Sequence, residues 1–193
     1  MSYVLILFFS RTGHIAKLAE AIGEGAESTG MEARLRTVPS LHPSFHDADQ
    51  SDPFMDAQGY LYASKEDLAD CAALALGSPS RFGAIAAPLK GFLEQTSDLW
   101  LSGTLVDRPA GVFTSASTLH GGHEGVLQSM MMPLIHHGMV VCGLPYTEPG
   151  LRQLSGGGTP YGPSHVDQES LAPHEHALAV ALGRRLALWS LRR

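Results

Sequence analysis

The chain has 193 residues, a hydrophobic content of 44% and a charged content of 17%, values typical of a globular protein with one ordinary-sized domain. Its formal net charge of −6, from 13 basic and 19 acidic residues, argues against a surface that binds nucleic acid. No apolar run is long enough to cross a membrane and the start lacks the layout of a signal peptide, so we expect a cytoplasmic protein with a single domain over residues 1–193.

The start of the chain predicts a strand, a tight loop and a helix. Residues 3–9 are all apolar, as in a strand that is buried on both faces, and apolar residues then return at helical spacing from Ile15 onward. A loop of this kind directs backbone N–H groups and the positive end of a helix at one point, which suits a phosphate. Ser10 and Thr12 add hydroxyl groups, and Gly13 allows close approach. The alternative is an ordinary helix start capped by a serine.

The rest of the chain alternates strands with helices. Further strands are predicted at residues 31–38, 71–77, 110–114 and 139–144. Ser64 caps one predicted helix, and the last predicted helix places four side chains on one side: Leu178, Ala181, Leu182 and Trp189. Residues 39–63 and 145–167 show no clear period and predict long irregular segments. Cys71 and Cys142 lie in apolar runs, and we expect both to be buried free thiols.

Five short apolar strands that alternate with helices predict an α/β fold, a doubly wound parallel sheet with helices on both faces. In such sheets, ligands bind beyond the carboxyl ends of the strands, near the point where the strand order reverses. Polar loops that contain glycine follow three of the predicted strands, at residues 10–13, 78–83 and 115–122. We therefore expect these three loops to converge on one crevice that binds a ligand.

Seven segments occur in a fixed order over nearly the whole chain. They are Ser10-x-x-Gly13-His14-Ile15, Gly77-Ser78-Pro79-Ser80-Arg81-Phe82-Gly83, Phe92-Leu93-Glu94-Gln95-Thr96, Leu99-Trp100-x-Ser102-Gly103, His120-Gly121-Gly122-x-Glu124, His136-His137-Gly138-Met139 and Gly157-Gly158-Thr159-Pro160-Tyr161-Gly162. Together they resemble the WrbA family of flavodoxin-like NAD(P)H:quinone oxidoreductases, and the second and last segments are the most specific. The resemblance implies a flavodoxin-like five-stranded sheet of order 2-1-3-4-5, FMN as the cofactor and a homotetramer.

The resemblance also assigns roles by position. It places the FMN phosphate on the first loop and the two edges of the flavin ring on the other two, so that the cofactor-binding residues are Ser10, Arg11, Thr12, Gly13, His14, Ile15, Ser80, Arg81, Phe82, Ser115, Ala116, Ser117, Thr118, Leu119, His120, Gly121 and His137. His137 is the implied catalytic residue and reaches the flavin from a neighbouring subunit. Trp100 and Thr12 are the implied substrate contacts, although the family often has an aromatic residue at position 12. Ser80 stands in place of a more usual threonine and keeps the hydroxyl group.

Plainer interpretations of several residues remain open from the sequence alone. Arg81 could be a solvated surface charge and Trp100 a core residue. His136 and His137 could simply offset the negative end of a helix. No metal site is predicted, because the spacing of the histidines and aspartates in the irregular segment fits no known site: His42, His46, Asp47 and Asp49.

Two functions are compatible with this reading. In the first, FMN mediates the two-electron reduction of a quinone by NADH or NADPH, with alternating hydride transfers at flavin N5. The alternative is a flavodoxin-type one-electron carrier, which would bracket its flavin with aromatic side chains and dock through a strongly acidic surface. The glycine-rich third loop and the modest net charge favour the enzyme. The expected partners are the quinone, the nucleotide and other copies of the chain, with neither nucleic acid nor a membrane, and the aromatic residues of the irregular segments are candidates for subunit interfaces: Phe54, Tyr60, Tyr62, Tyr146 and Tyr161.

Overall fold

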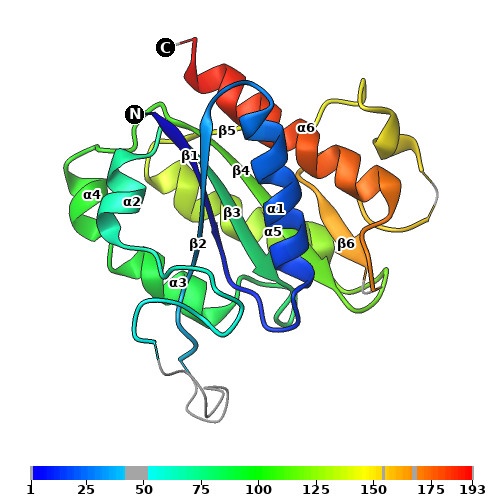
Figure 1. The fold of residues 1–193 in the computed structure, drawn as a ribbon, viewed down its shortest axis with the longest axis horizontal. Helices are drawn as coiled ribbons and strands as arrows, with labels where there is room; N and C mark the ends of the chain where they lie inside the picture. The colour runs from blue at the N-terminus through cyan, green and yellow to red at the C-terminus, as the bar shows by residue number, and fades with distance from the viewer. Residues whose placement is uncertain (1, 42–51, 154, 167–168, 193) are drawn as a thin grey trace.

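The computed structural model of the chain describes residues 2–41, 52–153, 155–166 and 169–192. A parallel sheet stands between two layers of helices, with strands in the order β2-β1-β3-β4-β5 and a further strand, β6, beside β4 (Figure 1). The strands are β1 (Tyr3–Phe8), β2 (Glu32–Thr37), β3 (Ala73–Pro79), β4 (Pro109–Ala116), β5 (Val140–Val141) and β6 (Ser164–Val166). The predicted doubly wound parallel sheet of order 2-1-3-4-5 is confirmed.

The helices cover both faces of the sheet. They are α1 (His14–Glu27), α2 (Lys65–Asp70), α3 (Ala87–Glu94), α4 (Ser97–Leu101), α5 (His123–His136) and α6 (Pro173–Ser190), with a short 3₁₀ helix, η2 (Pro149–Arg152). Helices α1 and α6 pack together on the near side of the sheet in Figure 1, whereas α3 and α5 cover the far side. Ser64 caps α2 with a reciprocal pair of hydrogen bonds to Asp67, as predicted.

The unbroken apolar run of β1 follows from this layering. Successive side chains of a strand point to opposite faces, and here both faces are buried. Val4 and Ile6 pack into the core beneath α1 and α6, while Leu5 and Leu7 pack into the core beneath α3 and α5. Both cysteines are buried free thiols, as predicted. Among the helices of the described residues, none combines the length and the apolar character needed to cross a bilayer.

The fifth strand differs from the prediction, which placed it at residues 139–144. Strand β5 pairs only with the start of β4, and β6 pairs in parallel with its end, where Ser115 stands beside His165. The segment between them leaves the sheet because Leu144 N–H donates to the Pro160 carbonyl rather than to β4, at 2.8 Å. Gly162 then lies so close to β4 that a Cβ atom would be 2.0 Å from the Val112 carbonyl oxygen.

The last helix buries most, but not all, of the side that the sequence predicts to be apolar. Leu178, Leu182 and Leu186 form its buried stripe, at the four-residue spacing of a helix face. Ala181 is only partly buried, and Trp189 is 43% exposed at the far end of the helix. Trp189 follows Leu182 by seven residues, about two helical turns, and so lies on the same side of α6 as predicted, but it is exposed because it stands at the end of the helix.

Candidate functional site

Three loops meet in one cavity at the carboxyl edge of the sheet, as the sequence predicts. The cavity has a volume of about 300 Å³ and is open to solvent. Residues from all three predicted loops line it: Thr12, His14, Pro79, Ser80, Arg81, Ser115, Ala116, Ser117, Thr118 and Gly121. Of these, Pro79 belongs to the second predicted loop but was not among the predicted cofactor-binding residues. We refer to this cavity as the crevice.

The first loop leaves the start of α1 open toward an anion. Gly13 precedes the helix with φ of 84°, a conformation that favours glycine, and no side chain caps the helix. The first bond of the helix runs from Lys17 N–H to the Gly13 carbonyl, so the preceding amides have no partner within the helix. The Ser10 hydroxyl is buried and has no hydrogen-bond partner among the described residues. The serine-cap alternative is therefore wrong, and these groups fit a bound phosphate.

Hydrogen bonds join the second and third loops to each other. Ser80 N–H donates to the Ser115 carbonyl at 2.8 Å, and the Ser80 hydroxyl donates to the Gly121 carbonyl at 2.6 Å. A Cβ atom on Gly121 would lie 2.4 Å from the Cβ atom of Ala116, so only glycine fits there. The two loops thus form one rigid wall of the crevice.

Phe82 stands at the tip of a two-residue hairpin in the second loop. Arg81 and Ala84 exchange both backbone hydrogen bonds, each 3.1 Å long, and Phe82 and Gly83 have φ of 53° and 77°. Positive φ at both central residues defines a type I′ turn, which phenylalanine adopts only with strain. The Phe82 side chain is nevertheless fully exposed, at 109%. A strained, exposed aromatic ring indicates a residue kept for contact with a ligand or a partner.

The guanidinium group of Arg81 gives the crevice a positive charge. Burial and, secondly, the nearby charge of Arg11 lower the pKa of Arg81, which remains protonated at neutral pH. Arg81 lines the crevice from an exposed position. In a chain of net charge −6, this local reversal of sign favours an anionic ligand.

Other predicted cofactor residues lie outside the crevice wall. Ile15 is fully buried in the core, so that only its backbone amide faces the loop. Leu119 and His120 line a neighbouring cavity of about 390 Å³, whose other wall includes Gly157 and Thr159. The glycine-rich segment at residues 157–162, which carries part of the family resemblance, therefore lies across this neighbouring cavity from the third loop.

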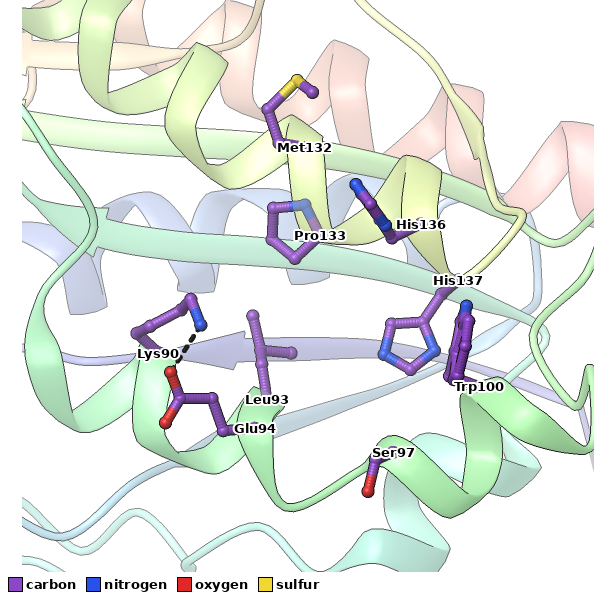
Figure 2. Close-up of a pocket in the computed structure, with 9 residues that line it drawn as sticks. All are labelled: Lys90, Leu93, Glu94, Ser97, Trp100, Met132, Pro133, His136 and His137. Carbon is purple, nitrogen blue, oxygen red and sulfur yellow. Dashed lines mark hydrogen bonds and ion pairs between the residues drawn. The ribbon is translucent and has the colours of Figure 1, made fainter.

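His137 and Trp100 lie in a separate groove (Figure 2). Its volume is about 400 Å³, and Figure 2 shows these two residues toward one end and the Lys90–Glu94 ion pair at the other. Helix α5 starts beside the Arg81–Ala84 hairpin, where Gly122 packs against Gly83, and its 14 residues carry the chain roughly 21 Å away before His137. Within one chain, the structure does not bring His137 to the crevice.

The surroundings of both groove residues are defined. Trp100 is 54% exposed on α4, so the core alternative is wrong. His137 is only 7% exposed and its Nε2 lies 3.1 Å from the Thr96 hydroxyl. Burial and the neighbouring His136 lower the pKa of His137, which keeps the ring neutral at pH 7.

Sequence reasoning missed two buried residues behind the crevice, His165 and Glu175. Their side chains hydrogen-bond each other, and the His165 ring packs against the ring of His14. No local motif marks them, because the pair joins β6 to α6 and the contact with His14 spans most of the chain. The described residues contain no cluster of three potential metal ligands, and His42, His46, Asp47 and Asp49 lie outside those residues.

Comparison with known proteins gives the family. Residues 4–147 match the family described as NADPH-dependent FMN reductase. The chain belongs to this family. It is 39% identical over 175 residues to a protein of Rhizobium rhizogenes named NAD(P)H dehydrogenase (quinone), with 86% of this chain and 83% of that protein covered. A protein of the same name from Cupriavidus metallidurans is 40% identical over 168 residues, with the same shares covered.

Solved structures agree with this assignment at the level of the fold. A WrbA-like flavodoxin from Agrobacterium tumefaciens superposes with a TM-score of 0.72 at 23% identity, covering 100% of this chain and 99% of that one. An archaeal flavodoxin gives a TM-score of 0.65 at 16% identity, covering 98% and 99%. The flavodoxin-like fold and the resemblance to the WrbA family are confirmed. The prediction that the chain uses FMN, with NAD(P)H as the electron donor, is confirmed as well.

Proposed function

We propose that this protein is an NAD(P)H:quinone oxidoreductase, in which FMN mediates the two-electron reduction of quinones. The name that the curated relatives carry, NAD(P)H dehydrogenase (quinone), supports this enzyme class. The observation that carries the proposal is the crevice itself, because three loops bring an uncapped helix start and the guanidinium group of Arg81 to one anion-binding point. When bound, FMN would supply the redox chemistry by taking a hydride from the nucleotide and passing two electrons to the quinone.

The chain's own residues bind and orient the reactants. The amides at the start of α1 and the hydroxyl of Ser10 would hold the FMN phosphate, with Thr12 and His14 beside it. The wall formed by Ser80 and the loop at residues 115–121 would hold the flavin ring, and Arg81 and Phe82 would contact its edge. Thr12 is also proposed to contact the nicotinamide nucleotide.

The enzyme is favoured over a one-electron carrier by the composition of the crevice wall. Between Ser115 and Gly121 the loop holds no phenylalanine, tyrosine or tryptophan, so the ring would be open on that side to a flat nucleotide or quinone. Phe82 projects from the opposite loop. Both substrates could then stack in turn on the same exposed flavin face.

A homotetramer would complete the site. His137 lies too far along α5 to reach the crevice of its own chain, so it would reach the flavin of a neighbouring subunit, with Trp100 flanking the substrate space. The groove around them exposes apolar Met132 as well as Trp100, as expected of a surface covered by another subunit. Among the aromatic candidates for interfaces, Tyr60 is used within the chain: its ring lies 5.1 Å from Phe8, edge to face.

Oligomeric state is tested by light scattering on the purified holoprotein. Met132→Glu places a charge in the groove, and we expect it to yield smaller species and a lower turnover. Leu188→Glu, at an exposed apolar position on α6, is the matched control. A wild-type protein that is monomeric and fully active would contradict the tetramer and the role of His137.

The proposed reaction is tested by anaerobic kinetics. NADH or NADPH should bleach the flavin absorbance, and a quinone should restore it in a separate step. Initial rates measured against both substrates should give parallel double-reciprocal lines, because the nucleotide leaves before the quinone binds. Failure of both nucleotides to bleach a protein that retains FMN would favour the carrier.

A further inference from the structure

A buried histidine and glutamate form a pair directly behind the crevice. Nδ1 of His165 lies 2.7 Å from Oε2 of Glu175, and both side chains are almost completely removed from solvent. Glu175 is in the first turn of α6, and His165 is on β6. Burying two side chains that can carry charge costs folding free energy unless each of their polar atoms has a hydrogen-bond partner. The presence of this pair therefore indicates a specific role.

Glu175 is held as a carboxylate by donors from three segments. Besides His165, the backbone N–H groups of Gly157, Ala172 and Val166 donate to it at 2.7, 2.9 and 3.3 Å. Burial by itself would raise the pKa of Glu175, but the hydrogen bonds from His165, Ala172 and Gly157 outweigh it and lower this pKa to about 2. A carboxylate can only accept, so His165 donates to it from Nδ1 and the orientation of its ring is fixed.

The fixed ring of His165 touches the first loop of the crevice. The rings of His165 and His14 lie 5.4 Å apart between centroids with an angle of 30° between their planes. His14 is the first residue of α1 and lines the crevice. His165 also stands in register with Ser115 on the neighbouring strand β4, and the third loop begins at Ser115. The pair therefore supports the phosphate end of the crevice from beneath.

We propose that Glu175 and His165 are positioning residues for the cofactor's phosphate: Glu175 fixes the ring of His165, and His165 supports the ring of His14 against the phosphate. This inference rests on the proposed function, in which the phosphate of FMN occupies the crevice beside α1. It assigns the pair to the phosphate and not to the flavin ring, whose proposed contacts lie on the second and third loops.

The proposal is tested by comparing FMN with riboflavin, which lacks the phosphate. His165→Asn keeps a donor for Glu175 and removes the ring that supports His14. We expect it to raise the Kd for FMN about tenfold, the effect of losing one hydrogen bond to a charged group, and the Kd for riboflavin less than about twofold. In a His14→Ala background, His165→Asn should leave the Kd for FMN nearly unchanged, because the residue it acts through is absent.

A control variant separates this role from general packing. His176 and Glu24 form an exposed pair, with nitrogen and oxygen 3.1 Å apart, that joins α6 to α1 away from the crevice. His176→Gln should leave the Kd for both ligands unchanged. The ³¹P resonance of bound FMN should move in His165→Asn and stay in place in His176→Gln, since only the first changes the surroundings of the phosphate.

The outcomes distinguish this inference from the proposed function. Equal losses of FMN and riboflavin affinity in His165→Asn, or the same loss in the His14→Ala background, would overturn the positioning role. A wild-type protein that binds riboflavin as tightly as FMN would instead overturn the placement of the phosphate. If His165→Asn does not fold, the wild-type protein still decides: the ring resonances of His14 and His165 should shift with FMN but not with riboflavin, and equal shifts would refute the proposal.

Discussion

The Nε2–H of His137 donates to the Thr96 hydroxyl oxygen, at 3.1 Å. The direction follows from Thr96, whose single hydroxyl proton is donated to the Leu93 carbonyl at 2.7 Å, an oxygen that can only accept. Nδ1 of the neutral ring therefore carries a lone pair, and it has no hydrogen-bond partner among the described residues. Because Nδ1 is also buried, donation from His137 to the electron-rich edge of a neighbouring flavin would require both protonation of the ring and a movement that uncovers Nδ1.

Thr96→Val tests the contribution of this hydrogen bond. Valine matches threonine in shape but leaves the buried Nε2–H of His137 without an acceptor, which should cost about 1–3 kcal/mol of folding free energy. Thr96→Ser keeps the oxygen and should lose less than about 1 kcal/mol. Urea denaturation of both variants measures the difference. Equal stability of the two variants would mean that this hydrogen bond contributes nothing.

The buried His137 also predicts a loss of stability in mild acid. Its folded-state pKa is lowered from 6.5 by burial and by His136, so the unfolded chain takes up the proton first as the pH falls. The free energy of unfolding should therefore decrease as the pH falls through 6.5 toward the lower folded-state value. His137→Gln should remove this component, whereas exposed His136→Gln should keep most of it. Urea midpoints at about pH 7.5 and about pH 5.5 provide the comparison.

Gly13 and Gly30 form a matched pair for testing the first loop. Both have φ of 84°, and in both an added Cβ atom would meet nothing within 4 Å. Alanine at either position should therefore cost a similar ~1 kcal/mol of stability, from the left-handed backbone alone. Only Gly13→Ala should also weaken FMN binding, because Gly30 lies at the opposite end of α1. Similar FMN affinities in the two variants would contradict the assignment of the first loop to the FMN site.

Phe82→Asn should separate stability from binding. Asparagine tolerates the left-handed backbone, and Asn-Gly is the favoured pair in a two-residue type I′ turn, so the variant should be more stable by about 0.5–1 kcal/mol. Because the exposed ring contributes no packing within the chain, nothing offsets this gain. Flavin affinity or the KM for quinone should worsen. A variant that is more stable and binds equally well would show that the aromatic ring has no role at this site.

Local patterns in the sequence were sufficient to predict most strands of the sheet and the three loops that form the crevice. The apolar run of β1 and the polar loop after it mark a buried parallel strand, and parallel geometry then brings the three loops to one edge. The split of the fifth strand was not predictable in this way, since the three residues of β6 carry no apolar alternation and their partner, β4, is distant along the chain.

The pair behind the crevice lacked a sequence signal for the same reason. Glu175 reads as an ordinary acidic residue in the first turn of a helix, where it also stabilises the helix start. Its contact with His165, and that of His165 with His14, exist only once α1, β6 and α6 pack together. The resemblance to known flavoproteins assigned residues of the loops and gave no indication of this supporting layer.

Glu175 should make the protein sensitive to strong acid. Its pKa is lowered from 4.5 to about 2 in the folded state, so its stabilising effect is complete above 4.5 and is lost as the pH falls toward 2. That shift corresponds to roughly 3 kcal/mol of folding free energy over this window. Glu175→Gln should lower stability at neutral pH and flatten the dependence on pH between these values. The exposed Glu24→Gln is the control and should leave the profile unchanged. Chemical denaturation across this range gives the measurement, and a Glu175→Gln profile as steep as that of the wild type would show that another carboxylate is responsible.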